Sequence, residues 1–317
     1  MMFIFIAVGA FSTFYLSCVT GQKYMNAFGN DINKCLFGNW MESSFPIMKR
    51  PVDCTGNSRT GLCYGTLQKT LFAVCYNSDT LIPDFTGHVV LPFSQVPSRG
   101  SYKNEIGLFE STQQVLQKRG QNRGGWRNEN GNYAPKPQSD VKEDYKQIKQ
   151  KFGQNICVYN RGHLTPYGNF ELVEEREFTM VNTNIAPQCQ DFNGGKWKFL
   201  EDAVKNYSTK YKSKLYVITG TARLLEHKHV GLLKLNKRVT VPEYFWKAIC
   251  DPKRKMRRSV VYTARNPTDS EKVGFLEINS VKMLKEKFPE INLPEFDEVC
   301  NPDEIGDFLE EFLKENF

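Results

Sequence analysis

YNRGHLTPYGNF (residues 159–170) and TNIAPQCQDFNGGKWKFLED (residues 183–202) are the stretches that decide the interpretation of this 317-residue chain. The first predicts a strand that ends at Tyr159, a polar turn over residues 160–162, and then His163. A neutral histidine suits the work of a general base near neutral pH, because its reference pKa is about 6.5. Arg161 adds a planar guanidinium that can bind a phosphate. These two side chains indicate chemistry at a phosphate group.

The second stretch predicts a helix that begins at Asn193. The side-chain oxygen of an asparagine is a hard, neutral ligand that suits Mg²⁺ and leaves the charge of the ion undiminished. On a regular helix Glu201 shares the face of Asn193 and lies about 12 Å further along the axis. Glu201 is therefore expected to hold metal-bound water, and Lys205 continues the same face. This set predicts metal-assisted hydrolysis of a phosphodiester.

Each of these motifs is common by itself, and Trp197 and Leu200 fit a hydrophobic core better than a ligand site. Their conjunction and order are informative. They resemble the DNA/RNA non-specific endonucleases of the ββα-metal class, whose motifs are D-R-G-H, N-x-x-P-Q and N-x-x-x-W-x-x-L-E. The matching segments are residues 160–163, 184–188 and 193–201. The resemblance extends to residues 217–221 and 241–247, and it spans about residues 60–290.

The resemblance implies an α+β fold and a mechanism with a single Mg²⁺, or Mn²⁺, ion. It implies that His163 is the general base, that Asn193 is the direct metal ligand and that Glu201 holds the water shell of the ion. It also implies that Arg161 stabilises charge on the phosphate and that Lys205 binds substrate. The leading aspartate of the family motif is Asn160 here, which calls into question any role that requires a carboxylate at that position.

The pattern of apolar residues predicts strands and helices without a regular βαβ alternation, which favours an α+β fold with a mixed or antiparallel sheet. The expected strands are 71–76, 85–91, 155–159, 215–220, 238–241 and 272–278, with an extended segment at 180–185. The expected helices are 141–151 and 194–207, with a charged helical segment at 171–177. A long polar loop is expected over 94–140, with one helix near 106–118.

Four regions are expected along the chain. Residues 1–21 are apolar and uncharged, and they predict a secretory signal peptide, with a membrane anchor as the alternative. Residues 22–60 form a Cys-containing extension, and residues 61–300 form the nuclease domain. Residues 301–317 predict an acidic amphipathic helix with Ile305, Phe308, Leu309 and Phe312 on one face. The expected location is extracellular, without stable membrane association.

Eight cysteines remain after residue 21, at positions 35, 54, 63, 75, 157, 189, 250 and 300. An even number in an exported chain predicts up to four disulfides, whose connectivity cannot be deduced from sequence. Four of these cysteines fall between residues 35 and 75, so we expect the N-terminal region to be the most heavily cross-linked. The absence of a C-x-x-C pair argues against a zinc ribbon or a thioredoxin-like site in this sequence.

The chain carries 42 Lys and Arg against 35 Asp and Glu, a net charge of +7. A secreted basic surface suits a polyanion such as a nucleic acid. The densest cluster is 253–258, from which Lys253, Arg254 and Arg257 are expected to bind substrate. Two further basic sets lie at 118–127 and 142–149. Contacts to phosphates carry no base information, so these clusters favour binding with little sequence specificity.

The sequence thus predicts a secreted Mg²⁺-dependent endonuclease that acts on DNA, RNA or both. One alternative is a catalytically inactive protein that binds polyanions and keeps the nuclease fold. A second alternative is a phosphodiesterase of small substrates. His227 and His229 could bind a metal as an H-x-H pair, but a solvated loop is the favoured interpretation. The sequence leaves the oligomeric state open.

Overall fold

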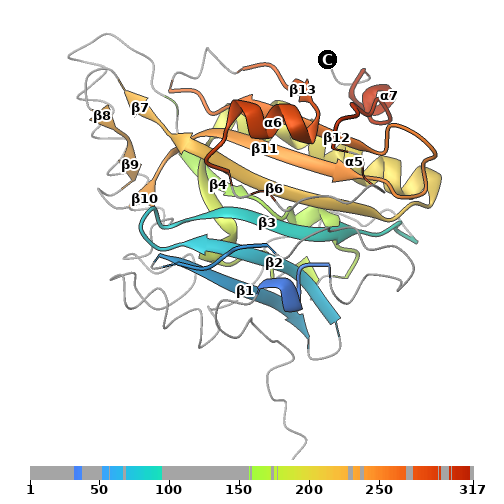
Figure 1. The fold of residues 1–317 in the computed structure, drawn as a ribbon, viewed down its shortest axis with the longest axis horizontal. Coiled ribbons are helices and arrows are strands. Elements are labelled where there is room, and N and C mark those ends of the chain that lie inside the picture. The colour runs from blue at the N-terminus through green and yellow to red at the C-terminus, as the bar shows by residue number, and fades with distance from the viewer. Residues whose placement is uncertain are drawn as a thin grey trace, which may run out of the picture.

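The computed structural model describes fourteen stretches of the chain (Figure 1). They are residues 32–37, 52–56, 58–66, 69–94, 157, 159–172, 175–176, 178–227, 231–235, 239–268, 274–291, the single residues 293 and 300, and 302–314. The predicted signal peptide, most of the predicted loop 94–140, the predicted helix 141–151 and the two basic sets at 118–127 and 142–149 lie outside these residues, as does His229.

A seven-stranded antiparallel sheet forms the centre of the protein. Its order is β1-β2-β3-β6-β11-β12-β13, so neighbours in space are often distant in sequence. The strands are β1 (Arg59–Thr66), β2 (Lys69–Asn77), β3 (Ile82–Val90), β6 (Leu215–Leu224), β11 (Pro242–Cys250), β12 (Ser259–Arg265) and β13 (Glu277–Asn279). This architecture confirms the predicted α+β class with an antiparallel sheet.

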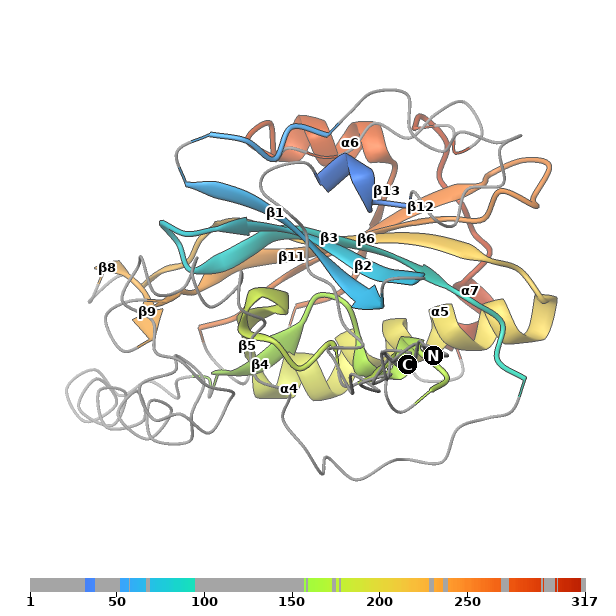
Figure 2. The ribbon, with the colours of Figure 1, turned by 90° about the horizontal axis from the view of Figure 1, so that it is seen from below.

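Both faces of the sheet are covered, as the edge-on view in Figure 2 shows. One face carries the 3₁₀ helix η1 (Ile32–Lys34) and α6 (Val281–Lys287). The other carries β4 (Tyr159–His163), β5 (Ile185–Cys189), α4 (Gln190–Phe192) and α5 (Lys198–Tyr211). Side chains alternate along β11: Trp246 and Ala248 enter the first core, whereas Phe245 and Ile249 enter the second.

Shorter elements complete the described chain. They are η3 (Tyr167–Asn169), η4 (Asn182–Asn184), the π-helical turn η5 (Asn193–Trp197), β7 (Glu226–His227), β8 (Gly231–Leu232), β9 (Lys234–Leu235), β10 (Val239–Thr240) and α7 (Glu310–Lys314). Strand β4 pairs with β5, β7 with β8, and β9 with β10, each pair being antiparallel. Within the described residues, no helix is long and apolar enough to cross a membrane.

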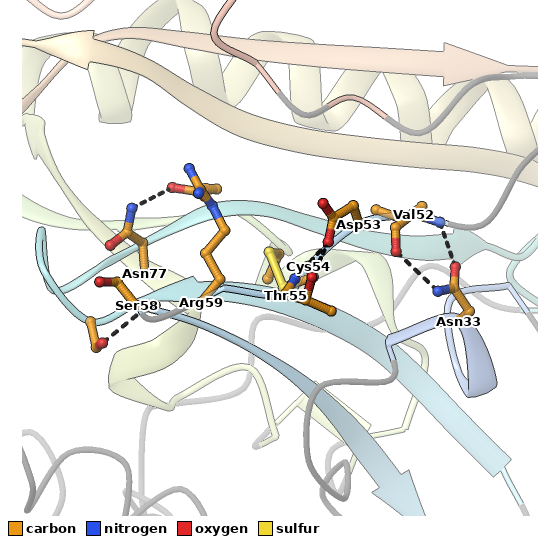
Figure 3. Close-up of a disulfide and its surroundings, with 11 residues drawn as sticks. Asn33, Val52, Asp53, Cys54, Thr55, Ser58, Arg59 and Asn77 are labelled. Atoms are coloured by element: carbon orange, nitrogen blue, oxygen red, sulfur yellow. Dashed lines mark hydrogen bonds and ion pairs between the residues drawn. A yellow bond between two sulfur atoms is a disulfide. The ribbon is translucent and has the colours of Figure 1, made fainter.

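All eight cysteines after residue 21 form disulfides, as predicted. Two of the four bonds hold the N-terminal extension to the sheet. They join Cys35 to Cys63 and Cys54 to Cys75, which confirms the expected cross-linking of this region. Figure 3 shows the polar contacts beside the second bond. Asn33 exchanges two hydrogen bonds with the backbone of Val52, at 3.0 and 2.6 Å. The described parts of the extension are thus attached to the sheet.

The structure differs from three local predictions. Strand β4 begins at Tyr159 and runs to His163, so residues 160–162 belong to a strand and form no turn. The predicted helix at 194–207 is a π-helical turn followed by α5, which ends at Tyr211. Among the described residues of the C-terminal segment, only α7 is helical; Phe308 and Leu309 are buried as expected, but Ile305 is 41% exposed.

Candidate active site

A β-hairpin-like pair followed by a helix lies on one face of the sheet, and it contains most of the predicted site residues. In β4 and β5, Asn160 pairs with Gln188 and His163 pairs with Ile185. The disulfide between Cys157 and Cys189 joins the start of this pair to its end. The chain thereby forms the ββα arrangement that the resemblance implies.

The buried side chain of Asn266 fixes this strand pair to the central sheet. Its Nδ2 atom donates hydrogen bonds to the carbonyl oxygens of Pro187 and Pro242, at 3.0 and 2.9 Å. Its Oδ1 atom accepts a hydrogen bond of 2.9 Å from the Cys189 amide. Pro187 and Cys189 lie in β5 and Pro242 lies in β11, so one amide side chain sets the distance between the two layers.

Close packing explains the glycine of the R-G-H motif. A methyl group at Gly162 would lie 2.5 Å from Gln188 Oε1 and 2.9 Å from the carbonyl oxygen of Ala186. Real Cβ atoms do not approach other atoms so closely, so any side chain at Gly162 would push β4 and β5 apart. The residue type at this position therefore serves the packing of the pair and not the chemistry.

Asn184, the first residue of the N-x-x-P-Q motif, has a structural role. Its Nδ2 atom donates to the carbonyl oxygens of Thr165 and Thr179, both at 2.9 Å. Its Oδ1 atom accepts a hydrogen bond of 2.9 Å from the Thr165 amide. These bonds fix the chain immediately after His163, so the motif positions the predicted base without joining its chemistry.

The side chain of Asn193 is oriented by Asn160. Asn193 Nδ2 donates a hydrogen bond of 2.8 Å to Asn160 Oδ1. Within the described residues, Asn193 Oδ1 accepts no hydrogen bond, which leaves the oxygen for a ligand. An amide oxygen at position 160 can therefore accept this bond as a carboxylate would, so the departure from the family motif leaves this orienting contact in place.

Asn193 opens η5, where the backbone departs from a regular helix. Gly195 has φ −102° and ψ −115°, which breaks the helix between Asn193 and α5. Trp197 is fully buried, with its ring 5.8 Å from that of Phe245 in β11. The buried Trp197 fixes the start of α5. The axial separation of about 12 Å expected between Asn193 and Glu201 presupposes an unbroken helix, so it does not apply to this chain.

Glu201 is a half-buried carboxylate on α5 that accepts no hydrogen bond from the described residues. Burial raises its pKa to about 7, and the positive charge of Lys247 opposes this shift. Lys247 comes from β11, is 1% exposed and donates a hydrogen bond of 2.7 Å to Thr219 Oγ1. Burial lowers the pKa of Lys247 to about 8. Each group thus shifts the pKa of the other toward its charged form.

In the sequence, Lys247 is part of the segment 241–247 that resembles the nuclease family, and no role is predicted for it. One local feature could have singled it out. It lies between Phe245 and Ile249 at the period of two that directs side chains to one face of a strand. A lysine at such a position is rare in a core unless it has a partner. The partner of opposite charge is Glu201, which lies on α5 and therefore cannot be identified from the sequence of β11 alone.

His163 lies at the end of β4 and is half-buried. Burial lowers its pKa to about 4; the nearby charge of Arg161 acts in the same direction, and a hydrogen bond with the Arg161 backbone opposes it. Its Nε2 atom is 3.3 Å from Met180 Sδ. The imidazole is therefore neutral at neutral pH and can accept a proton.

The structure does not bring the predicted basic residues together. Lys205 forms an ion pair with Asp202 on the same helix, with 3.3 Å between Nζ and Oδ1. Arg254 and Arg257 both pair with Asp307, at 3.2 and 2.9 Å, and Lys253 donates to the Lys212 carbonyl at 2.8 Å. Lys205 remains beside Glu201, but the other three are bound to the chain's own groups.

The turn after β11 that contains the basic cluster 253–258, here called the basic turn, lies at the C-terminal end of α5. Tyr207 and Ser213, near the end of that helix, donate hydrogen bonds to Asp251 at 2.7 and 2.6 Å. Glu201 lies about 16 Å before Lys212 along a helix axis. Lys253, Arg254 and Arg257 thus lie at the opposite end of α5 from Glu201, which spacing in sequence did not indicate, and their contact with substrate stays a prediction.

Of the H-x-H pair only His227 lies among the described residues, where it is buried in a short strand and not in the predicted solvated loop. His227 is 6% exposed in β7. No group of three or more His, Cys, Asp or Glu side chains among the described residues could hold an ion. The oxygen of Asn193 and the carboxylate of Glu201 are two hard donors in the ββα arrangement.

Residues 56–286 match the sequence model of the family described as DNA/RNA non-specific endonuclease. The chain is 29% identical over 119 residues to the "Salivary endonuclease" of Lutzomyia longipalpis. That alignment covers 36% of this chain and 29% of the relative. It is 33% identical over 99 residues to the "Nuclease" of Serratia marcescens, covering 31% and 36%. The aligned part of the chain thus spans about a third of the length of these relatives.

A further relative and a solved structure also match the chain. The "Nuclease" of Nostoc sp. is 32% identical over 92 residues, covering 29% of this chain and 31% of that protein. A solved structure titled as an EndoG/EndoGI complex overlaps 72% of this chain and 83% of its own, with a TM-score of 0.43 and 18% identity.

Proposed function

Because the chain belongs to the DNA/RNA non-specific endonuclease family, we propose that it is a secreted, metal-dependent nuclease that cleaves DNA, RNA or both with little sequence specificity. The observation that carries the proposal is the orientation of Asn193 by Asn160 on the ββα face that also bears His163 and Glu201. The uncharged apolar segment 1–21 and the four disulfides support secretion.

The donor set fits Mg²⁺ or Mn²⁺, which prefer oxygen ligands. Asn193 would hold the ion through Oδ1, and Glu201 would hold water molecules of its shell. When bound, the ion would draw negative charge from the phosphate oxygens. The proximity of Lys247 favours the ionised form of Glu201 and so supports this role.

The other residues act on the proton and on the phosphate. His163, neutral at neutral pH, takes a proton from the attacking water as the water oxygen bonds to phosphorus and the ester bond breaks. Arg161, two residues earlier in β4, supplies a fixed positive charge for the phosphate oxygens. Lys205 adds a second positive charge close to Glu201.

Parallel digestion of duplex DNA, single-stranded DNA, RNA and a dinucleotide tests the proposal. We expect cleavage of at least one polymer with Mg²⁺ and none with a chelator. Binding without cleavage in every buffer would favour the inactive polyanion-binding alternative. Faster turnover of the dinucleotide than of any polymer would favour the phosphodiesterase of small substrates.

Replacing Lys247 with methionine is expected to weaken Mg²⁺ binding about tenfold at pH 7 and to leave it nearly normal above pH 8.5. Methionine keeps the volume of the side chain but removes the charge that favours ionised Glu201, so the Glu201 pKa rises above 7. At pH 7 a rise of somewhat more than one unit lowers the ionised fraction about tenfold. Calorimetric titration with Mg²⁺ between pH 6 and 9 measures the effect.

Lys210→Met is the matched control, because Lys210 is an exposed lysine on the same helix. It should leave the pH dependence unchanged. Equal Mg²⁺ affinities for wild type and Lys247→Met at every pH, in a variant that unfolds at the normal temperature, would remove Lys247 from the site.

The double variant Arg254→Gln, Arg257→Gln tests the basic turn. Both arginines pair with Asp307, so we expect a loss of up to about 1 kcal/mol of unfolding free energy per pair, the usual worth of a partly exposed ion pair. The salt dependence of DNA binding should not change. Denaturant unfolding and binding at several salt concentrations measure both quantities.

Lys255→Gln is the control for the double variant, because it removes one positive charge from an exposed position of the same turn. A decrease of about 0.9 in the log–log salt slope per removed arginine would show that the turn contacts duplex DNA after all.

A further inference from the structure

Phe275 is the most exposed of the large hydrophobic side chains in the described part of the chain, at 81%. The next residue, Leu276, packs against the core beneath α5, and β13 begins at Glu277. The backbone is thus anchored while the phenyl ring points into solvent. The apolar face of the ring is therefore available to a ligand, and covering it would remove apolar surface from water.

The ring lies beside the candidate active site. Lys196 Nζ is 3.9 Å from the centroid of the Phe275 ring. Lys196 belongs to η5 and follows Asn193 by three residues. Gly194 and Gly195 separate the two, and a Cβ atom at either glycine would meet no heavy atom within 4 Å. The surface between Asn193 and the ring therefore has no side chain at either glycine that would obstruct a large substrate.

Lys196 covers one face of the ring, and the high exposure leaves the opposite face accessible. A flat aromatic face suits a nucleobase, because every base has a π face that can stack on it. The positive charge of Lys196 beside this ring suits a phosphate of the strand. Stacking of this kind does not depend on base identity, in agreement with a nuclease of little sequence specificity.

We propose that Phe275 and Lys196 form a nucleotide subsite in which one base of the substrate strand stacks on Phe275 while Lys196 contacts the adjoining phosphate. This inference rests on the proposed function, because it names a substrate contact of the same site. Bases in a duplex are already paired and stacked, so the subsite favours single-stranded or locally unpaired nucleic acid.

The test measures binding of a 12-nucleotide single-stranded thymidine oligomer by fluorescence anisotropy, with a chelator present so that the strand stays intact. Phe275→Ala is expected to weaken binding about 5- to 100-fold, the range of one base–aromatic stack. Phe275→Trp should restore it, whereas Phe275→Leu should not. A duplex of equal length should show a smaller loss.

An abasic oligomer of the same length and charge separates stacking from electrostatics. It should bind wild type and Phe275→Ala equally, because no base is left to stack. Met256→Ala is the matched control: Met256 is 71% exposed in the turn after β11, and its removal should leave all affinities unchanged. Equal affinity of wild type and Phe275→Ala for the thymidine oligomer would overturn the inference and would indicate that Phe275 serves a protein partner.

Cleavage assays keep this inference apart from the proposed function. Normal Mg²⁺-dependent cleavage by wild type, with no effect of Phe275→Ala on binding, overturns the subsite alone. Phe275-dependent binding by a wild-type protein that cleaves nothing supports the subsite and overturns the proposed function.

Discussion

His163→Ala is expected to lower kcat by about 10²–10⁴-fold, the usual contribution of a general base. Substrate affinity and folding should stay nearly normal, because the hydrogen bonds that fix the adjoining chain belong to Asn184 and Thr165. Single-turnover cleavage of a labelled oligonucleotide measures the rate, and thermal unfolding confirms the fold. A variant with near-wild-type turnover would show that His163 is not the base.

The pH profile gives a second readout of the same residue. Burial lowers the pKa of His163 to about 4, so its neutral form predominates from pH 5 upward. Its protonation should therefore not limit the wild-type rate near pH 6.5, where an ordinary histidine titrates. Any fall of activity between pH 7.5 and 6 must come from another group, and Glu201 is the one we expect.

Asn193→Ala is expected to abolish cleavage at ordinary Mg²⁺ concentrations and to regain part of it at high concentrations, where the substrate phosphate can help to hold the ion. Asn193 Oδ1 is, in our proposal, the only direct protein ligand. Glu201→Gln should be milder, with metal affinity reduced about 10- to 100-fold, because it acts through water. Mg²⁺ titrations of both variants by calorimetry and by activity measure the difference.

The pH dependence of metal binding distinguishes the two positions further. Burial raises the Glu201 pKa to about 7, so the carboxylate gains a proton as the pH falls through 7. Mg²⁺ affinity of the wild type should therefore fall over that range, and Glu201→Gln should lack this dependence. The proposed roles of Asn193 as direct ligand and Glu201 as holder of water are wrong if Asn193→Ala binds Mg²⁺ normally. They are also wrong if a metal-bound structure places a Glu201 oxygen about 2.1 Å from Mg²⁺, the distance of direct coordination.

Local patterns were sufficient for some strands and not for others. The apolar runs within β2 and β6 predicted those strands, because their neighbouring residues already show the buried character of a central strand. Strand β1 contains two glycines, which weaken the pattern. Strand β11 carries Glu243 and Lys247 among its apolar residues, so its identity as a central strand depends on contacts with β6 and β12.

The sequence by itself determined the chemistry of the candidate site: a histidine, an arginine, an asparagine and a glutamate in a fixed order, and an even set of cysteines. These features are local, since each motif spans only a few residues. The tertiary structure alone decided which residues meet: Asn160 with Asn193, Lys247 with Glu201, Lys196 with Phe275, and the basic turn with Asp307. Such pairs depend on strand register and layer packing, which are set by the whole chain and not by spacing within a motif.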